Sequence, residues 1–474
     1  MHDNSVRTLW RVTNPPYPLE PDRAAMTAIG SAAIDAVADF IEGLSTAPAS
    51  GPALPDDLLA DLVAPPGEAP NDFGGLLDRW QRAAAHAVET AGPSYLAYIP
   101  GGGLFAAAIA ELLAQAFNRY TGVSALAPGA VAVEHGVMRW LCDVFGLPAG
   151  AIGMATTGGS MATLSALVAA RHDRLGDDFA DGVLYVTEHT HRCVAKAARI
   201  AGFRDDQLRT VATTPELRMD IDAAVELIAA DRSSGRRPFA IVATAGSTDT
   251  GAVDDLTRLA ELARGEELWF HVDGAYGGFF QLTERGRRRL SGIERADSIV
   301  LDPHKGMFLP YGTGVVLVRD AATLRAPFAS RGQYLQDLHT GPELPDYADL
   351  GPELTRDYRG LRLWLPLHLH GVAAFRQALD EKLDLAAMAD AALRGDERIE
   401  LPWQPDLTVV AFRLRDGSDR AQQDWLQRIN AEQRAFLSST RVAGQYVLRL
   451  CVLCHRTHAD RIHETVDAIR RTLP

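Results

Sequence analysis

Four short apolar runs between residues 239 and 318 indicate the fold: Phe239-Ala-Ile-Val-Ala-Thr244, Leu268-Trp-Phe-His-Val272, Asp297-Ser-Ile-Val-Leu301 and Gly314-Val-Val-Leu-Val318. A similar run, Gly182-Val-Leu-Tyr-Val186, comes before them, and segments with helical spacing, such as 161–171 and 221–230, precede or separate the earlier runs. Apolar strands that alternate with helices are typical of an α/β domain with a mostly parallel sheet. Ligands of such domains bind at the carboxyl ends of the strands.

The sequence on either side of this region has a different pattern of apolar residues. Residues 22–41 and 73–91 have helical spacing, and the stretch between them is rich in proline and alanine. After residue 366 come helices, two alternating strands near 408–414 and 446–453, and a final helix. We therefore expect three parts: an N-terminal arm with helices over 1–90 that wraps a partner subunit, a large α/β domain over 91–365, and a small C-terminal α+β domain over 366–474.

Composition limits the classes of function. The chain has 474 residues, a formal net charge of −14 and no basic stretch that alternates with aromatic residues, which argues against a nucleic-acid or anionic-membrane partner. The N-terminus lacks a signal-peptide pattern, and the most apolar run, 104–117, is too short to span a bilayer. Cys451 and Cys454 lie in what reads as a buried strand rather than a metal site. We expect a cytoplasmic protein without a metal.

Positive charge is carried almost entirely by arginine, and the three lysines are Lys196, Lys305 and Lys382. Arginine cannot replace lysine where a deprotonated primary amine is required. Lys305 follows a predicted strand in Leu301-Asp-Pro-His-Lys305 and has apolar neighbours. Burial would lower the pKa of its ammonium group and allow the amine to attack a carbonyl. The alternative is a lysine that extends to the surface.

Three further patterns accompany this lysine. Asp273 ends a strand before Gly-Ala-Tyr-Gly-Gly, which fits either a carboxylate facing a crevice or a helix N-cap. The turn Ala155-Thr-Thr-Gly-Gly-Ser160 leads into a helix, where free amides can bind phosphate. His191 follows a strand two residues after His189, a spacing that does not make a metal site by itself. Either histidine could instead be a loop residue in water.

Together these motifs resemble the group II decarboxylases that depend on pyridoxal 5′-phosphate (PLP). The order is the glycine-serine turn, the histidine, Thr244-Ala-Gly-Ser-Thr-Asp-Thr-Gly251, Asp273-x-Ala275 and Asp302-Pro-His-Lys305, most similar to the aromatic-L-amino-acid decarboxylase branch. The resemblance runs from about residue 90 to the C-terminus. It implies the PLP-dependent transferase-like fold (fold type I) with a mostly parallel seven-stranded sheet, PLP as the cofactor, and decarboxylation of a small-molecule L-amino acid.

The resemblance also implies roles for individual residues. Lys305 would carry PLP as a Schiff base, Asp273 would pair with the pyridine nitrogen and make the ring an electron sink, and His191 would stack on the ring. The other implied contacts are Gly159 and Ser160 with the phosphate, His304 beside it, Ala275 against the ring, Ser247 near the ring oxygen, and Tyr98 and Ile99 in the substrate pocket.

Tyr334, in Gly332-Gln-Tyr-Leu-Gln336, stands where the family has a tyrosine on a mobile loop donated by the other subunit. In the family this tyrosine protonates the carbanion left by decarboxylation, and phenylalanine there tends toward oxidative aldehyde formation. The resemblance therefore implies plain decarboxylation in a homodimer with active sites at the subunit interface. A surface tyrosine is the alternative.

The sequence departs from the family at two places. Gly306 stands where an aromatic residue commonly follows the lysine, and Ala91-Gly92 stand where a histidine often precedes the Pro-x-x-x-Ala-Tyr segment. Both bear on the substrate, for which we expect an aromatic or bulky apolar amino acid. The competing interpretations are aminotransfer or oxidative deamination on the same cofactor, a nucleotide-binding oxidoreductase that uses Gly158-Gly159 for phosphate, and a non-catalytic protein that has kept the fold.

Overall fold

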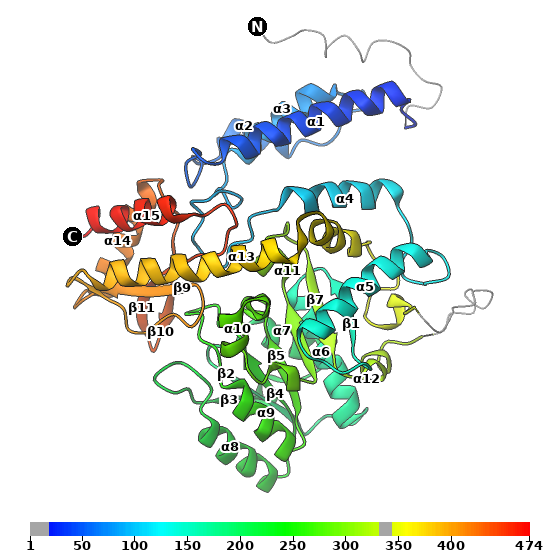
Figure 1. Cartoon of the computed structure of the whole chain (residues 1–474), viewed down its shortest axis with the longest axis vertical. Helices are drawn as coiled ribbons and strands as arrows, with labels where there is room; N and C mark the ends of the chain where they lie inside the picture. Colours follow the sequence, from blue (N-terminus) through cyan, green and yellow to red (C-terminus); the bar gives the residue numbers. More distant parts are fainter. Residues whose placement is uncertain (1–18, 331–343) are drawn as a thin grey trace.

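A computed structural model describes residues 19–330 and 344–474 of the chain. Its larger sheet has seven strands in the order β1-β7-β6-β5-β4-β2-β3, of which β7 alone runs antiparallel to its neighbours (Figure 1). The strands are β1 (Ile152–Thr156), β2 (Gly182–Thr187), β3 (Leu208–Val211), β4 (Arg237–Thr244), β5 (Trp269–Asp273), β6 (Ser298–Leu301) and β7 (Gly314–Val318). This confirms the expected α/β fold with a mostly parallel seven-stranded sheet.

Both faces of this sheet are buried, as the uninterrupted apolar runs predict. Along β4, Ala240 and Val242 face one hydrophobic core, while Ile241 and Ala243 face another on the opposite side. The first core is covered by α6 (Gly159–Leu175), α7 (Cys193–Ile200) and α12 (Ala321–Arg325). The second is covered by α5 (Pro128–Val144), α8 (Ile221–Ser233) and α9 (Leu256–Gly265). Shorter elements near the sheet are α10 (Glu284–Arg289) and α11 (Pro303–Gly306).

A second, smaller sheet has four antiparallel strands in the order β10-β11-β9-β8. These are β8 (Ile399–Glu400), β9 (Val409–Leu414), β10 (Ser438–Val442) and β11 (Gln445–Cys451), and they pack with α14 (Asp419–Ala431) and α15 (Ala459–Arg471). Leu96, far away in the sequence, is fully buried in the same core. Tyr95 forms a parallel bridge with Phe436, so the segment around residue 96 packs with the small sheet.

The long helix α13 (Gly360–Arg394) connects the two sheets (Figure 1). Its first part packs against α4 (Phe105–Phe117) and α5, and its second part contributes Leu385 and Leu393 to the core of the small sheet. Gly371, with φ 74° and ψ 151°, breaks the helix between these parts. In the second part, Lys382 is fully buried and donates from Nζ to the carbonyl of Thr457 and to Glu381.

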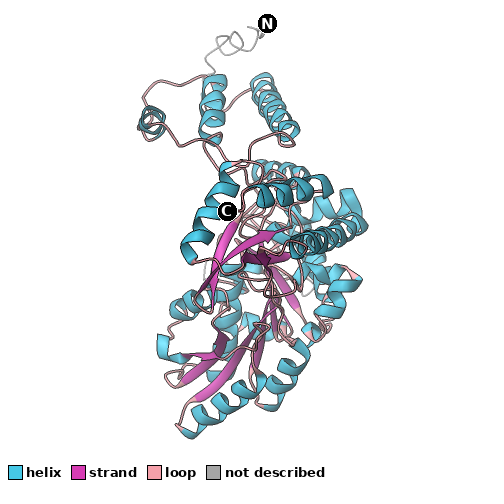
Figure 2. Cartoon of the chain, turned by 90° about the vertical axis from the view of Figure 1, so that its left-hand side faces the viewer, coloured by secondary structure: helices cyan, strands magenta, loops and turns pink. Residues whose placement is uncertain are grey.

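Three N-terminal helices stand away from the two sheets (Figure 2): α1 (Arg23–Gly43), α2 (Asp56–Leu62) and α3 (Phe73–Ala84). Asp22 caps α1 by accepting a hydrogen bond from the amide of Ala25. None of the residues of α1 is buried, and by length and composition alone α1 is apolar enough to cross a membrane. The third helix is shorter than the predicted 73–91, because Val88 pairs instead with Ser50 in a bridge.

Candidate active site

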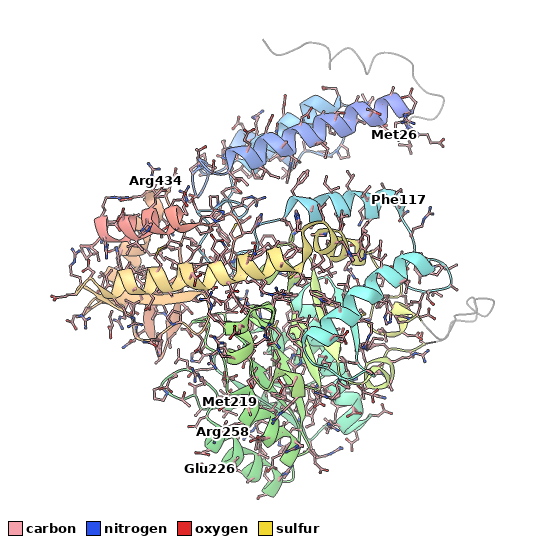
Figure 3. All side chains as sticks on the ribbon, viewed as in Figure 1. Met26, Phe117, Met219, Glu226, Arg258 and Arg434 are labelled. Carbon is pink, nitrogen blue, oxygen red and sulfur yellow. The ribbon has the colours of Figure 1, made fainter. Side chains whose placement is uncertain are left out.

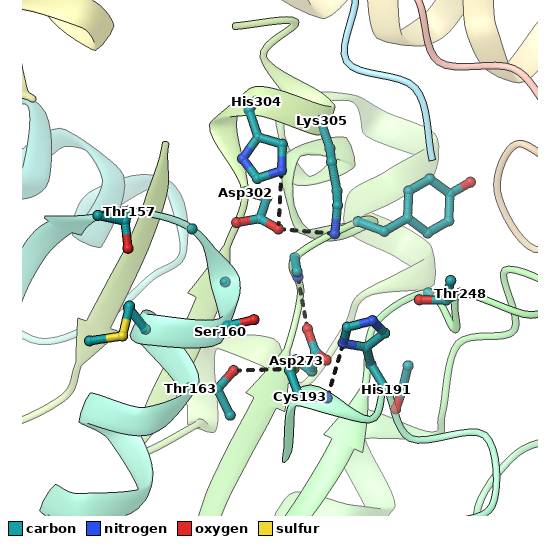
Figure 4. A pocket seen from close by; sticks show the side chains of 17 residues that line it. Thr157, Ser160, Thr163, His191, Cys193, Thr248, Asp273, Asp302, His304 and Lys305 are labelled. Atoms are coloured by element: carbon teal, nitrogen blue, oxygen red, sulfur yellow. Dashed lines mark hydrogen bonds and ion pairs between the residues drawn. The ribbon is translucent and has the colours of Figure 1, made fainter. Parts of the chain in front are cut away.

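A cavity of about 300 Å³ opens at the carboxyl ends of the parallel strands of the large sheet (Figure 4). Its walls come from the turn between β1 and α6, the loop after β2, the loop after β4, the end of β5 and the segment after β6. The lining residues are Thr157, Gly158, Gly159, Ser160, Met161, Thr163, His191, Cys193, Thr244, Gly246, Thr248, Asp273, Ala275, Tyr276, Asp302, His304 and Lys305. The volume lies at the lower end of the ~300–1,000 Å³ typical of small-molecule pockets.

Lys305 lies on the short helix α11, where Pro303 occupies the first turn. Its Nζ donates to Oδ2 of Asp302 over 2.9 Å, since residues three apart on a helix share a face. Burial lowers the pKa of Lys305, but the charge and hydrogen bond of Asp302 and the charge of Asp273 raise it, and the net pKa is above its usual value. The sequence-based expectation of a lowered pKa is therefore wrong for this cavity, because it took no account of Asp302.

Asp273 ends β5, in parallel register with Thr244 of β4 and Val300 of β6. Its side chain is buried at the floor of the cavity, and Oδ1 accepts a hydrogen bond from the amide of Ala275 over 3.1 Å. Lys305 lies on the opposite side of the same cavity (Figure 4). Both side chains therefore face one space of ligand size.

His191 stands at the side of the cavity, in the loop after β2. Its Nδ1 accepts a hydrogen bond from the amide of Cys193 over 3.3 Å, which leaves the proton of the neutral ring on Nε2. Burial lowers the pKa of His191; the charge of Asp273 works in the opposite direction. A neutral imidazole can stack flat against an aromatic ligand without bringing a further charge into the site.

Gly159 and Ser160 lie in the first turn of α6, where helical geometry leaves the amides without carbonyl partners. Gly158 precedes them with φ 145°, a conformation that favours glycine. A Cβ on Gly314, at the start of β7, would lie 2.4 Å from the carbonyl carbon of Gly158, so the turn and the strand require glycine for their close approach. The amides and the helix dipole suit an anion here.

His304 closes this end of the cavity. Its Nδ1 donates to the carbonyl of Thr313 over 2.7 Å, and its Nε2 lies 3.6 Å from Oδ2 of Asp302. Burial lowers the pKa of His304. The hydrogen bond to Thr313 thus fixes the proton of the neutral ring on Nδ1.

The arrangement fits PLP. Among the residues described, Oδ1 of Asp302 is a buried oxygen that has no hydrogen-bond partner within the chain, as expected where a bound group completes the site. The free amides of α6 suit a phosphate, the carboxylate of Asp273 suits a protonated ring nitrogen, and Lys305 supplies the amine for an aldehyde.

The chain matches the pyridoxal-dependent decarboxylase conserved domain over residues 55–415. It belongs to this family. It is therefore a PLP-dependent amino-acid decarboxylase, as the resemblance of its motifs implied.

Individual relatives cover almost the whole chain. The aromatic-L-amino-acid decarboxylase of Bacillus atrophaeus is 34% identical over 94% of this chain and 95% of its own length. The L-2,4-diaminobutyrate decarboxylase of Rhizobium meliloti (strain 1021) is 32% identical over 88% of this chain and 85% of its own. Among solved structures, that of Oryza sativa TDC with PLP and tryptamine superposes with a TM-score of 0.91 at 26% identity, covering 97% of this chain and 99% of that one.

Not every predicted site residue of the decarboxylase faces the cavity. Ser247 is buried and its Oγ pairs with the hydroxyl of Thr250, while the neighbouring Thr248 lines the cavity. Ile99 is packed in the core of the large sheet, and Tyr98 is 59% exposed and does not line the cavity. Lys305, Asp273, His191, Gly159, Ser160, Ala275 and His304 all line it. Tyr334 lies outside the described residues.

The residues that the motifs did not single out include Asp302, Thr248 and Cys193. Asp302 stands within the quoted motif Asp302-Pro-His-Lys305, and its position three residues before a helical lysine could have revealed the contact. Gly306, which we expected to bear on the substrate, does not line the cavity. It is buried, and a Cβ there would lie 2.6 Å from Cβ of Phe279. Its missing side chain makes room for Phe279 in the core and does not enlarge the cavity.

Proposed function

We propose that the enzyme decarboxylates an aromatic or bulky apolar L-amino acid to the amine and carbon dioxide. The observation that carries the proposal is that Lys305, Asp273 and the N-terminus of α6 all line one cavity. The 34% identical aromatic-L-amino-acid decarboxylase supports the aromatic class.

In this proposal each end of the cavity holds a different part of PLP. Gly159 and Ser160 bind the phosphate, with His304 beside them, Asp273 holds the ring nitrogen, and Lys305 is the point of covalent attachment. His191 and Ala275 lie against the ring, and Thr248 takes the place we had given to Ser247. When bound, PLP supplies an electron-poor ring that accepts the electron pair released as the carboxylate departs.

The residues around the lysine handle its proton. Oδ2 of Asp302 accepts a hydrogen bond from Nζ of Lys305 over 2.9 Å, so this carboxylate holds the ammonium form whenever the lysine is free. Removal of a proton from Nζ is then required before the amine can act as a nucleophile. Asp302 also keeps the amine of Lys305 within the cavity that would hold the cofactor.

Tyr334 is proposed to deliver a proton to the substrate Cα after carbon dioxide leaves, on the support of the resemblance alone. The variant Tyr334→Phe is expected to keep PLP affinity and carbon dioxide release but to lose most of the amine product. Amine and aldehyde are quantified by chromatography against carbon dioxide. Tyr446→Phe, on β11 of the small sheet and not among the residues that line the cavity, serves as the control. Unchanged amine yield in Tyr334→Phe would show that another acid serves.

The substrate class is tested by measuring carbon dioxide release from a panel of amino acids. Tryptophan, tyrosine, phenylalanine and leucine represent the proposed class, while glutamate and L-2,4-diaminobutyrate represent charged substrates. The diaminobutyrate is included because of the 32% identical relative that acts on it. A kcat/KM highest for a charged member would overturn the proposed class.

The alternative is a different reaction on the same cofactor, namely oxidative deamination to an aldehyde or aminotransfer. These reactions differ from plain decarboxylation in their products, because plain decarboxylation gives one amine per carbon dioxide and consumes no oxygen. An oxygen electrode read alongside the amine assay separates them. Oxygen uptake equal to carbon dioxide release would favour the oxidative route.

We propose further that the enzyme is a cytoplasmic homodimer. Apolar side chains are exposed on two helices, with Met26, Val37 and Phe40 on α1 and Leu112 and Phe117 on α4. Met26 and Phe117 are marked on these helices in Figure 3. Exposed groups of apolar side chains are typical of surfaces that bind a partner chain, and this supports a dimer. The four cysteines are free thiols, consistent with a reducing compartment.

The assembly is tested by light scattering after size exclusion. Phe117→Glu is expected to shift the mass from dimer toward monomer, whereas Val225→Glu, at an exposed position on α8, is expected to leave the mass unchanged. A wild-type mass equal to one chain would contradict the dimer.

A further inference from the structure

The segment that carries Tyr98 is built onto the small sheet. The amide of Leu96 donates to the carbonyl of Phe436 over 3.0 Å, and the amide of Cys451 donates to the carbonyl of Leu96 over 2.9 Å. Leu96 itself is buried in the core of that sheet. The proposed substrate segment is therefore attached to the C-terminal part of the chain.

The loop that carries Thr248 belongs instead to the large sheet, because it follows β4 directly. Thr248 and Gly246 of this loop line the cavity. The segment around Tyr98 and the loop that lines the cavity at Thr248 thus belong to different sheets, and contacts across the junction fix their relative position.

Arg449 of β11 makes these contacts. It is 2% exposed, and its Nη2 donates to the carbonyls of both Tyr98, over 3.0 Å, and Thr248. Its Nε donates to the carbonyl of Asp249 over 2.7 Å. Its Nη1 donates to Oγ of Ser438 over 2.9 Å. A planar guanidinium with donors in a fixed fork suits such a junction, whereas an ammonium does not have this geometry.

The backbone of Tyr98 depends on this junction. Its φ is 50°, in the left-handed region that non-glycine residues rarely adopt. Such a conformation persists where the surroundings fix it. Here the carbonyl is held by Arg449, and the amide donates to Oγ of Ser438 over 3.0 Å, which is the same hydroxyl that Arg449 binds. The side chain of Tyr98 remains 59% exposed and available to a ligand.

A second contact across the junction lies beside the first. The hydroxyl of Thr440 in β10 donates to Oδ1 of Asp249 over 2.5 Å, and Oδ2 of Asp249 lies 3.5 Å from Nδ1 of the buried His189. Asp249 is thus held from the small sheet through both its carbonyl and its carboxylate. This explains why the loop after β4 has a fixed place relative to the small sheet.

We infer that Arg449 is a positioning residue for substrate recognition, which fixes Tyr98 of the small-sheet unit against Thr248 of the cofactor cavity. The inference rests on the proposed function in taking Tyr98 to contact the substrate. Arg449 does not line the cavity and acts through the backbone carbonyls of Tyr98, Thr248 and Asp249.

The test compares Arg449→Lys with Arg413→Lys, a control on β9 of the same sheet whose guanidinium binds the carbonyl of Gly417 away from the cavity. In Arg449→Lys, KM for the best substrate is expected to rise about 10-fold, as loss of one or two hydrogen bonds implies. The PLP dissociation constant, measured by absorbance titration, is expected to stay within about two-fold of wild type, because the cavity residues are unchanged. Arg413→Lys is expected to change neither quantity.

A second variant distinguishes a specific effect on KM from a general loss of folding. Ser438→Ala removes only the hydroxyl between Arg449 and the amide of Tyr98, and it is expected to raise KM in the same direction by a smaller factor. Equal KM values in wild type and both variants would overturn the inference. So would a parallel loss of PLP affinity and thermal stability, since that would indicate a general structural role.

Hydrogen exchange gives a readout that is independent of the substrate. In Arg449→Lys, peptides that cover 94–103 and 246–251 are expected to exchange faster, while peptides of β5 and β6 keep their wild-type rates. Unchanged exchange in the first two peptides would overturn the inference. Because KM is measured with whichever amino acid the wild type decarboxylates best, an error in the proposed substrate class would leave this comparison intact.

Discussion

The two sides of the active site are built in different ways. The cofactor side consists of turns that follow strands of one sheet, and the parallel register of β4, β5 and β6 sets Asp273 beside Thr244 and Val300. The side that we propose to recognise the substrate joins segments that are far apart in the sequence: the amide of Tyr98 donates to a hydroxyl 340 positions later. The first side depends on a rigid sheet, and the second depends on hydrogen bonds between two sheets.

This difference predicts which changes damage chemistry and which damage recognition. Substitutions on the cofactor side should lower kcat or abolish PLP attachment, because those side chains line the cavity that we propose to hold the cofactor. Substitutions at the junction of the two sheets should act mainly on KM. The following experiments sharpen the comparison, from the largest expected effect to the smallest.

Replacing Lys305 should have the largest effect. Lys305→Ala is expected to abolish multiple turnover and to remove the adduct trapped by borohydride, because no other lysine lines the cavity. Mass spectrometry of the reduced protein measures the adduct. Lys196→Ala, at an exposed position on α7, should retain both properties. Multiple turnover in Lys305→Ala would refute the assignment.

Asp273→Asn should come next, with kcat reduced by about 10²–10³-fold, the range seen when one preorganised electrostatic partner is removed. The physical reason is that a neutral amide no longer stabilises a protonated ring nitrogen. Asp273→Glu keeps the charge and should lose less activity. Steady-state kinetics at saturating PLP compares the Asp273→Asn and Asp273→Glu variants. If Asp273→Asn were as active as the wild type, the ring nitrogen would have to bind another residue.

Asp302→Asn should shift the pH dependence of PLP binding to the apoenzyme. After burial, the charge and hydrogen bond of Asp302 are the main influences on the pKa of Lys305, and they raise it. Without that charge the pKa of Lys305 falls, so the neutral amine forms at lower pH. The rate at which the apoenzyme recombines with PLP is then expected to rise at lower pH than in wild type. Asp222→Asn, on the surface of α8, is the control; a profile unchanged in Asp302→Asn would contradict this account.

The smallest effect concerns acid stability. Burial lowers the pKa of His271 in β5 to about 4, whereas an unfolded histidine titrates near pH ~6.5. The unfolded chain therefore binds more protons in this window, and stability falls as pH falls from the unfolded toward the folded value. His271→Asn is expected to reduce the slope of unfolding free energy against pH by up to about one proton. His172→Asn, at an exposed position on α6, is the control for urea titrations at several pH values.

Much of the cofactor side could be predicted from the sequence, because its residues lie directly after apolar strands. All five expected strands of the large sheet are present, while β1 and β3 were missed. β1 reads Ile-Gly-Met-Ala-Thr, which has a glycine and few β-branched residues, and β3 is a four-residue edge strand that is half polar. Short strands of this kind acquire their structure from neighbours rather than from local propensity.

The remainder depended on tertiary contacts. A motif could place Ser247 near the cofactor, but only the bond between Ser247 and Thr250 turns that hydroxyl away and leaves Thr248 at the cavity. The attachment of Leu96 to the small sheet could not be predicted, since its partners Phe436 and Cys451 come hundreds of residues later. Burial and Asp302 have opposing effects on the pKa of Lys305. Their balance could be judged only once the distance between the Lys305 amine and the Asp302 carboxylate was known.

The burial of the lysines has a practical consequence for protein chemistry. Lys382 is sealed in the interior and Lys305 lies within the cavity, which leaves Lys196 as the one exposed lysine side chain of the chain. Amine-reactive dyes, crosslinkers and activated resins would therefore meet a single handle besides the terminal amine. Molecules immobilised through Lys196 of α7 would share one orientation.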